Sequence, residues 1–148
     1  MEKEFLLLEL YKENWLQVRH HEQQRSSVSN IIIIINAGII GLITFDKVIL
    51  FNDLALTFLV FILGLFGCIF VLKQHERSMW HIRRARQYRL HLESVYDDLP
   101  IKQLNSTADS KHKNKMPIMF NVRLYIFWSG LHFIILCIGL ILCLFILI

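Results

Sequence analysis

The stretch NIIIIINAGIIGLITFDK, residues 30–47, decides the fold, because five consecutive isoleucines stand between two asparagines. In a soluble protein such a run is typical of a strand that is buried on both faces. Inside a membrane it predicts a helix, since every backbone N–H and C=O must be bonded within the segment. Isoleucine's weak helix propensity opposes this by only a few tenths of a kcal/mol per residue.

Two further apolar blocks favour the membrane interpretation. A spanning helix needs about 20 apolar residues, because the hydrocarbon core is about 30 Å thick and each residue rises about 1.5 Å. Residues 54–72 and 124–148 carry no charged side chain and meet this length, and residues 28–45 approach it. A soluble fold of 148 residues could not hide three such blocks. We therefore predict an all-α membrane protein with three transmembrane helices and helical extensions in the cytoplasm.

The charged segments complete the expected organisation. Leu8, Tyr11, Trp15 and Val18 recur at helical spacing and form one apolar stripe near the N-terminus. Pro100 and Pro117 are expected to act as helix breakers further along the chain. The expected parts are a cytoplasmic N-terminal helix (1–29), a two-helix transmembrane hairpin (30–72), a basic cytoplasmic helix (73–99), a cytoplasmic linker (100–122) and a third transmembrane helix (123–148).

The distribution of lysine and arginine predicts the orientation. Of the 16 such residues, four lie in the first 29 positions, eleven lie between residues 73 and 123, and Lys47 alone lies in the tight turn of the hairpin. Cytoplasmic loops carry the excess of positive charge in membrane proteins. We expect a bacterial inner (cell) membrane protein with the N-terminus in the cytoplasm and the C-terminus outside.

The densest chemical feature is the stretch HERSMWHIRRARQYRLH, residues 75–91. Basic residues next to a span fix topology and contact anionic headgroups, at about 1 kcal/mol per cation. The alternative is a phosphate-binding surface, because arginine forks match phosphate oxygens and aromatic rings stack on bases. The candidate ligand-binding residues are Arg77, Arg83, Arg84, Arg86, Tyr88 and Arg89. The spacing of Arg86 and His91 also fits a loose ribonuclease pattern, which leaves a membrane-tethered nuclease as a third option.

Polar residues inside the spans are few, and two of them are candidate pore or gate residues. Such residues usually face a neighbouring helix or a water-filled space. Asn36 lies in the first span, and His132 in the third span is able to titrate near neutral pH. A structural hydrogen bond is the alternative role for His132. The pairs Gly38–Gly41 and Gly64–Gly67 permit close helix packing and predict an assembly surface.

The sequence lacks the motifs on which common enzymes depend. There is no P-loop, no serine or cysteine catalytic signature, no clustered metal-ligand spacing and no dinucleotide fingerprint. The three cysteines lie inside the apolar blocks and are interpreted as small apolar residues. We therefore expect no enzyme, no catalytic residue, no bound metal and no cofactor.

Two stretches resemble the SLATT family of small bacterial transmembrane effectors. They are W..VR.HE.QR (residues 15–25), before the hairpin, and RARQYRLHLE (residues 84–93), which follows His75. The resemblance implies a homo-oligomer in the lipid bilayer that forms a pore or disrupts the membrane in anti-phage defence. It also implies a cyclic nucleotide or oligonucleotide ligand and a nucleotidyltransferase partner. The third span departs from the simplest two-span form. The alternative function is a non-conducting membrane anchor or regulatory subunit for a soluble partner.

Overall fold

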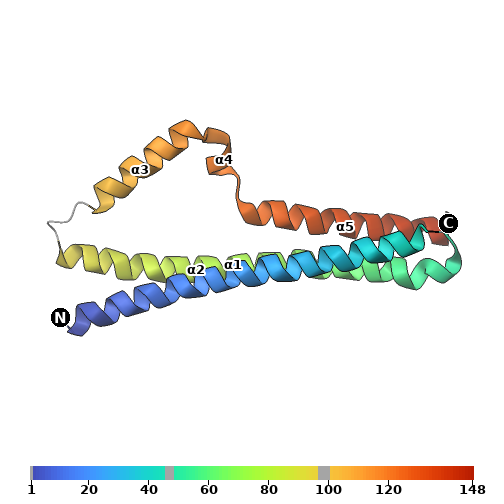
Figure 1. Cartoon of the computed structure of the whole chain (residues 1–148), viewed down its shortest axis with the longest axis horizontal. Coiled ribbons are helices and arrows are strands. Elements are labelled where there is room, and N and C mark those ends of the chain that lie inside the picture. The colour runs from blue at the N-terminus through green and yellow to red at the C-terminus, as the bar shows by residue number, and fades with distance from the viewer. Residues whose placement is uncertain (1, 46–48, 97–100) are drawn as a thin grey trace. The chain divides into compact units, whose positions relative to one another are not determined.

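The structure is a computed structural model, and it describes residues 2–45, 49–96 and 101–148. Within those residues the chain is helical apart from short connections and contains no strand. The elements, shown in Figure 1, are α1 (Glu2–Ile43), η1 (Phe51–Asp53), α2 (Leu54–Val95), α3 (Ile101–Lys115), α4 (Pro117–Asn121) and α5 (Leu124–Leu147). The all-α fold class is confirmed. The five isoleucines lie in α1, so the strand interpretation is wrong.

Three helices are long and apolar enough to cross a membrane: α1, α2 together with η1, and α5. The 24 residues of α5 correspond to about 36 Å, close to the thickness of the hydrocarbon core. The 42 residues of α1 or of α2 correspond to about 63 Å, roughly twice what a span needs. The predicted transmembrane helices are confirmed by length and composition. The oligomeric state, the kind of membrane and the orientation stay predictions.

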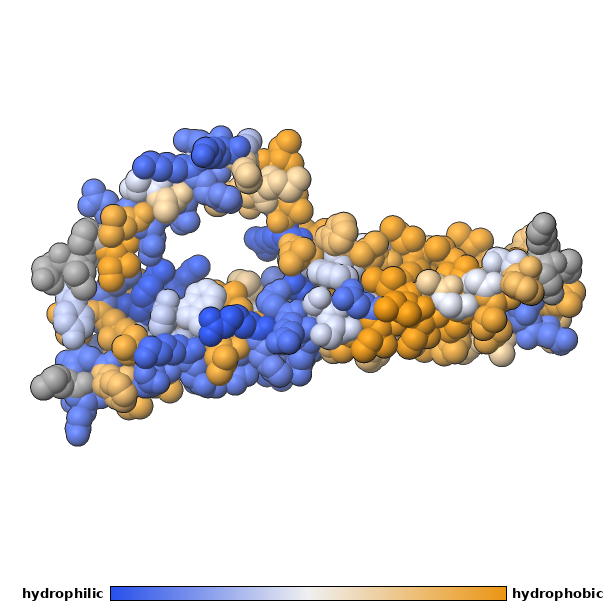
Figure 2. All heavy atoms as spheres, viewed as in Figure 1, coloured by the Kyte–Doolittle hydropathy of each residue, from blue (hydrophilic) through white to orange (hydrophobic). Residues whose placement is uncertain are grey.

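The chain forms two compact units. The membrane unit consists of Glu22–His75 and Leu124–Ile148, and the polar unit consists of Met1–His21 and Glu76–Arg123. Figure 2 shows mostly hydrophobic residues on the membrane unit and mostly hydrophilic residues on the polar unit. The boundary expected at residue 29 is not a break in secondary structure, because α1 continues from Glu2 to Ile43.

The interior of the membrane unit is a narrow seam of buried residues. They recur every three or four positions along α1 and α2 and at intervals of seven and four along α5, which is the spacing of one helical face. Ile39, Ile43 and Val60 form an apolar cluster within it, and Ile32 and Val71 are buried as well. The other buried positions among the described residues are small or polar, and they are Arg25, Ser29, Asn36, Thr57, Gly64, Gly67, His132, Gly139 and Cys143. Most apolar side chains of this unit therefore point outward, as a lipid environment allows.

Glycines set how closely α2 and α5 approach each other. A Cβ atom at Gly64 would lie 2.5 Å from the backbone nitrogen of Leu136, and one at Gly139 would overlap the backbone nitrogen of Phe61. At Gly38 and Gly41 on α1, no side chain and no other helix of the described residues lies within 4 Å of the corresponding position. The two glycine pairs expected to serve assembly therefore differ: Gly64 and Gly67 are used within one chain, and the pair on α1 is open.

The polar unit packs the first half of α1 against the second half of α2. The buried residues there are Asn14, Val18, Ser78 and Ala85. The expected linker, residues 100–122, is helical in most of its described part, with a break at Met116 between α3 and α4. α3 contains no buried residue, and its contact with α4 includes the rings of His112 and Phe120, whose centroids are 6.0 Å apart.

Candidate functional site

His132 lies at the junction of the three helices of the membrane unit. Its Nε2 atom shares a hydrogen bond of 3.0 Å with the Ser29 hydroxyl of α1. Both side chains have 0% exposure. The imidazole ring lies on Gly67 of α2, where a Cβ atom would overlap the ring. α1 thus supplies the hydrogen-bond partner, α2 the space and α5 the titratable group.

Two further polar contacts continue this interior row. Asn36 is 1% exposed, and its Nδ2 donates a hydrogen bond of 2.7 Å to the Ile32 carbonyl oxygen. The Cys143 thiol donates to the Thr57 hydroxyl at 3.2 Å, joining α5 to α2. We call Ser29, Asn36, Thr57, His132 and Cys143 the polar row. Both predicted gate residues, Asn36 and His132, belong to it, and their role in a pore or gate stays a prediction.

The polar row is incompletely hydrogen-bonded. The Nδ1 of His132 and the Oδ1 of Asn36 have no hydrogen-bond partner within the described residues, and neither has the hydroxyl of the neighbouring Ser129. Leaving a buried polar group without a partner costs about 1–3 kcal/mol. Water would supply the missing partners if it entered the seam.

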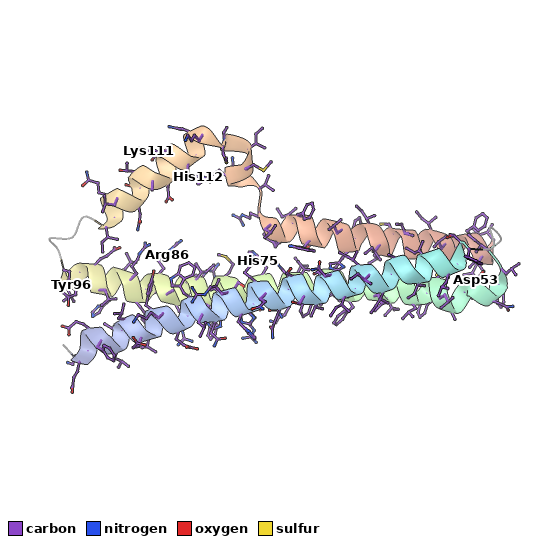
Figure 3. The ribbon with its side chains drawn as sticks, in the orientation of Figure 1. Asp53, His75, Arg86, Tyr96, Lys111 and His112 are labelled. Carbon is purple, nitrogen blue, oxygen red and sulfur yellow. The ribbon has the colours of Figure 1, made fainter. Side chains whose placement is uncertain are left out.

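The two ends of the α2 span carry polar residues. From Leu54 to His75, α2 is long enough to cross the hydrocarbon core, and Figure 3 labels Asp53 and His75 toward opposite ends of this stretch. Asp53 accepts a hydrogen bond of 2.8 Å from the Leu50 N–H. His75 stacks on Tyr125 with 3.8 Å between ring centroids. Polar residues therefore lie at both ends of this apolar stretch.

Arg25 is the one cation buried in the membrane unit among the described residues. It is 3% exposed and forms an ion pair with Glu22, one turn earlier on α1. Its Nε has no hydrogen-bond partner within the part of the chain that the structure describes. Sequence reasoning missed this residue, although Arg25, Ser29 and Ile32 follow the three- and four-residue spacing of the seam.

The six candidate ligand-binding residues are spread over several faces of α2. The guanidinium of Arg84 lies 4.7 Å from the centroid of Trp80 and donates a hydrogen bond of 3.4 Å to the Tyr88 hydroxyl. Arg89 forms an ion pair with Glu93 at 3.3 Å, and Arg77 forms one with Glu76 at 4.0 Å. The structure therefore brings Arg84 and Tyr88 together around Trp80.

Arg83 and Arg86 lie apart from that cluster. Both are exposed, and neither has a hydrogen bond or ion pair within the described chain. They are three residues apart and therefore share one side of α2, away from the buried residues Ser78 and Ala85. Figure 3 labels Arg86 on this helix. A single site that uses all six residues stays a prediction.

His81 makes a polar contact within the polar unit that the sequence did not predict. Its Nδ1 lies 2.9 Å from Oδ1 of Asn14, and its ring centroid lies 5.5 Å from that of His21. Burial lowers the pKa of His81, and so do the nearby His21, Arg84 and Arg77, while Glu13 acts in the opposite direction. The structure buries Asn14 rather than the Trp15 of the expected stripe. A hydrogen bond across the helix pair explains this burial.

A groove of about 220 Å³ lies beside Arg89 in the polar unit. It is smaller than most pockets for drug-sized ligands, which hold about 300–1,000 Å³. Arg89 and Glu93 form its charged wall, and its apolar and aromatic lining consists of Leu8, Tyr11, Leu92, Tyr96 and Ile101.

No group of three histidine, cysteine, aspartate or glutamate residues within the described residues is arranged to hold a metal ion. No protein-family model, no curated protein and no solved structure matches this chain. The resemblance to the SLATT family therefore stays a prediction.

Proposed function

We propose that the protein is a homo-oligomeric inner-membrane effector of bacterial anti-phage defence, without enzymatic activity, that permeabilises the membrane. The observation that carries this proposal is the polar row, which lies inside an otherwise apolar three-helix unit and is incompletely hydrogen-bonded. Separation of α5 from α1 and α2 would widen the seam, and His132, Ser29 and Asn36 would then line the space between the helices. Water entering there would satisfy the atoms that lack partners.

Oligomerisation is part of the proposal, because three helices alone cannot enclose a wide aqueous path. The outward faces of the membrane unit are apolar and exposed, as Ile34, Leu42 and Phe145 illustrate. Such faces are suited to contact with lipid and with further copies of the chain. The open Gly38 and Gly41 positions on α1 would permit a second helix to approach closely.

Control by a ligand on the polar unit completes the proposal. The Arg84–Trp80–Tyr88 cluster combines a planar cation with two aromatic rings, which suits a phosphate-bearing base. Exposed Arg83 and Arg86 add positive charge without internal partners in the described residues. A cyclic nucleotide or oligonucleotide made by a nucleotidyltransferase fits this surface, as the SLATT resemblance implies.

The test is membrane potential in bacteria that express the protein, with and without a candidate nucleotidyltransferase, read with a potential-sensitive dye. We expect depolarisation, and we expect Asn36→Leu and His132→Leu to change its rate more than they change protein abundance. The matched control is Thr44→Leu, because Thr44 is an exposed polar residue directly after α1 whose hydroxyl donates to carbonyl oxygens of α1, those of Ile40 and Gly41. An intact potential in dying cells under every triggering condition would contradict the proposal.

The second candidate is a non-conducting anchor or regulatory subunit for a soluble partner. It is favoured by α3, which contains no buried residue and so offers most of its surface for contact. Cells that keep their potential but lose a soluble partner from the membrane fraction when residues 101–115 are deleted would support this candidate.

A further inference from the structure

The short helix α4 and the residues on either side of it carry exposed apolar side chains. Met116, Ile118, Met119, Phe120 and Val122 are between 43% and 74% exposed. These five side chains lie within seven residues and form what we call the α4 patch, and exposed apolar patches usually mark an interaction site. The contact between Phe120 and His112 leaves most of this patch free.

Positive charge flanks the patch on both sides in the chain. Lys111, Lys113 and Lys115 precede α4, and Arg123 follows it. All four are exposed, and none forms an ion pair within the described residues. Asp109 is the one acidic residue between positions 99 and 148. Figure 3 labels Lys111 and His112 on α3. The patch is therefore bordered by cations that have no internal counter-charge.

The chain itself holds α4 near the end of a membrane-crossing helix. α4 ends at Asn121 and α5 begins at Leu124, so only two residues separate them. That connection spans at most about 10 Å, even when fully extended. Tyr125 and Trp128, at the start of α5, are of the residue types enriched where a helix leaves the bilayer. If α5 crosses the membrane, α4 lies at the membrane–water interface.

We propose that residues 111–123 form a binding element for anionic phospholipid. α4 lies in the plane of the interface, with Ile118 and Met119 in the boundary of the acyl chains. Lys111, Lys113 and Lys115 contact headgroup phosphates. A helix of five residues leaves most of its backbone groups without intrahelical partners, and water and headgroups supply them there. This element would act whether or not the protein conducts ions.

The experiment measures amide hydrogen exchange of the full chain in nanodiscs that hold one copy each. One set contains phosphatidylcholine alone, and the other an equal mixture with phosphatidylglycerol. Protection of a local element follows its opening equilibrium. Each cation near an anionic surface contributes a factor of about five, so three lysines contribute about 100-fold. We expect residues 118–122 to exchange more slowly in the anionic discs and to lose that difference in high salt.

Two variants and one control test the assignment. Lys111→Gln/Lys113→Gln/Lys115→Gln should abolish the dependence on phosphatidylglycerol. The control Lys3→Gln/Arg19→Gln/Lys102→Gln removes three other exposed cations of the same unit and should keep that dependence. Ile118→Ser/Met119→Ser should speed exchange in both kinds of disc.

Three results would overturn the proposal. One is exchange of residues 118–122 at the rate of unprotected amides in both kinds of disc. Another is a control variant that loses the dependence on phosphatidylglycerol as fully as the lysine variant does. The third is protection that ignores lipid charge and needs two copies per disc, which would assign the patch to a second copy of the chain.

Discussion

The membrane unit and the polar unit each contain a histidine that bonds across helices, in opposite surroundings. His132 is fully buried against Ser29, beneath an apolar exterior. His81 is partly exposed, and it bonds to Asn14 among charged neighbours. In lipid no water competes for a polar group, so the interior must satisfy it. In the polar unit, water and charged side chains share that task.

The two units differ in where their specific contacts lie. The outer surface of the membrane unit is mostly apolar, so the small and polar residues of the seam determine how its helices pack together. The polar unit has exposed arginines and lysines on its outside, which can distinguish ligands by charge and shape. We therefore expect changes to the seam to affect assembly of the fold, and changes to the arginines to affect recognition.

The largest effect should come from filling the seam. Gly64→Leu places a side chain against the backbone of Leu136, and backbone cannot move aside as a flexible side chain can. We expect a loss of about 3 kcal/mol in the free energy of unfolding. Thermal or denaturant unfolding in detergent measures it. Gly130→Leu on α5 is the control, because no side chain and no other helix of the described residues lies within 4 Å of its Cβ position. Equal losses in both variants would show that α2 and α5 do not pack this closely.

A smaller effect should follow from replacing Arg77, Arg83, Arg84, Arg86 and Arg89 with lysine. Insertion should be unchanged, because the topology rule counts charge and not shape. Ligand-triggered activity should fall about tenfold or more, since lysine cannot form a planar bidentate fork. Membrane fractionation and the depolarisation assay measure the two outcomes. Full activity in a correctly inserted variant would leave topology as the sole role of these arginines.

Paired substitutions compare the two histidine contacts directly. A double-mutant cycle with Ser29→Ala and His132→Phe should give a coupling energy of about 1 kcal/mol. The corresponding cycle with Asn14→Ala and His81→Phe should give less than half of that, because water replaces the lost partner. Unfolding in detergent measures both cycles. A larger coupling in the polar unit would reverse the comparison.

The smallest effect should be a pH dependence of the stability of the polar unit. The pKa of His81 lies below its ordinary value of 6.5, because burial and neighbouring cations disfavour the charged ring. The unfolded chain then takes up a proton more readily than the folded one. This contribution to stability is complete above pH 6.5 and is lost as the pH falls through and below that value.

His81→Gln should flatten that dependence, and His91→Gln, at an exposed position of the same helix, should not. Protease sensitivity of residues 76–96 between pH 5 and 7.5 provides the measurement, at roughly the range over which histidine titrates. An unchanged profile in His81→Gln would show that other groups produce the effect.

The sequence predicted the helices more readily than the faces they bury. The three apolar blocks predict three spans, because the length of each block and its lack of charged residues follow directly from the sequence. The sequence does not predict which isoleucine of residues 31–35 faces inward, since all five are alike and lipid is as apolar as the interior. The structure buries Ile32 and leaves Ile31, Ile34 and Ile35 exposed.

The candidate site was predicted only in part for the same reason. Asn36 and His132 were identified because polar residues stand out in an apolar span. Ser29 was assigned to the end of the N-terminal arm, and no local signal links it to a histidine 103 positions away. Thr57 and Cys143 likewise meet only because α5 packs beside α2. Such pairs depend on how separate helices meet rather than on local spacing.

The close packing of α5 on α2 also has a consequence for biosynthesis. The contact between Cys68 and Ser129 joins residues 61 positions apart. At about 5–20 residues per second, the ribosome adds that length in about 3–12 s. During this time the glycine face of α2 is in the bilayer without its own α5. Lipid or a neighbouring nascent chain covers it, so polysomes that crowd several chains together would favour exchange of α5 between copies.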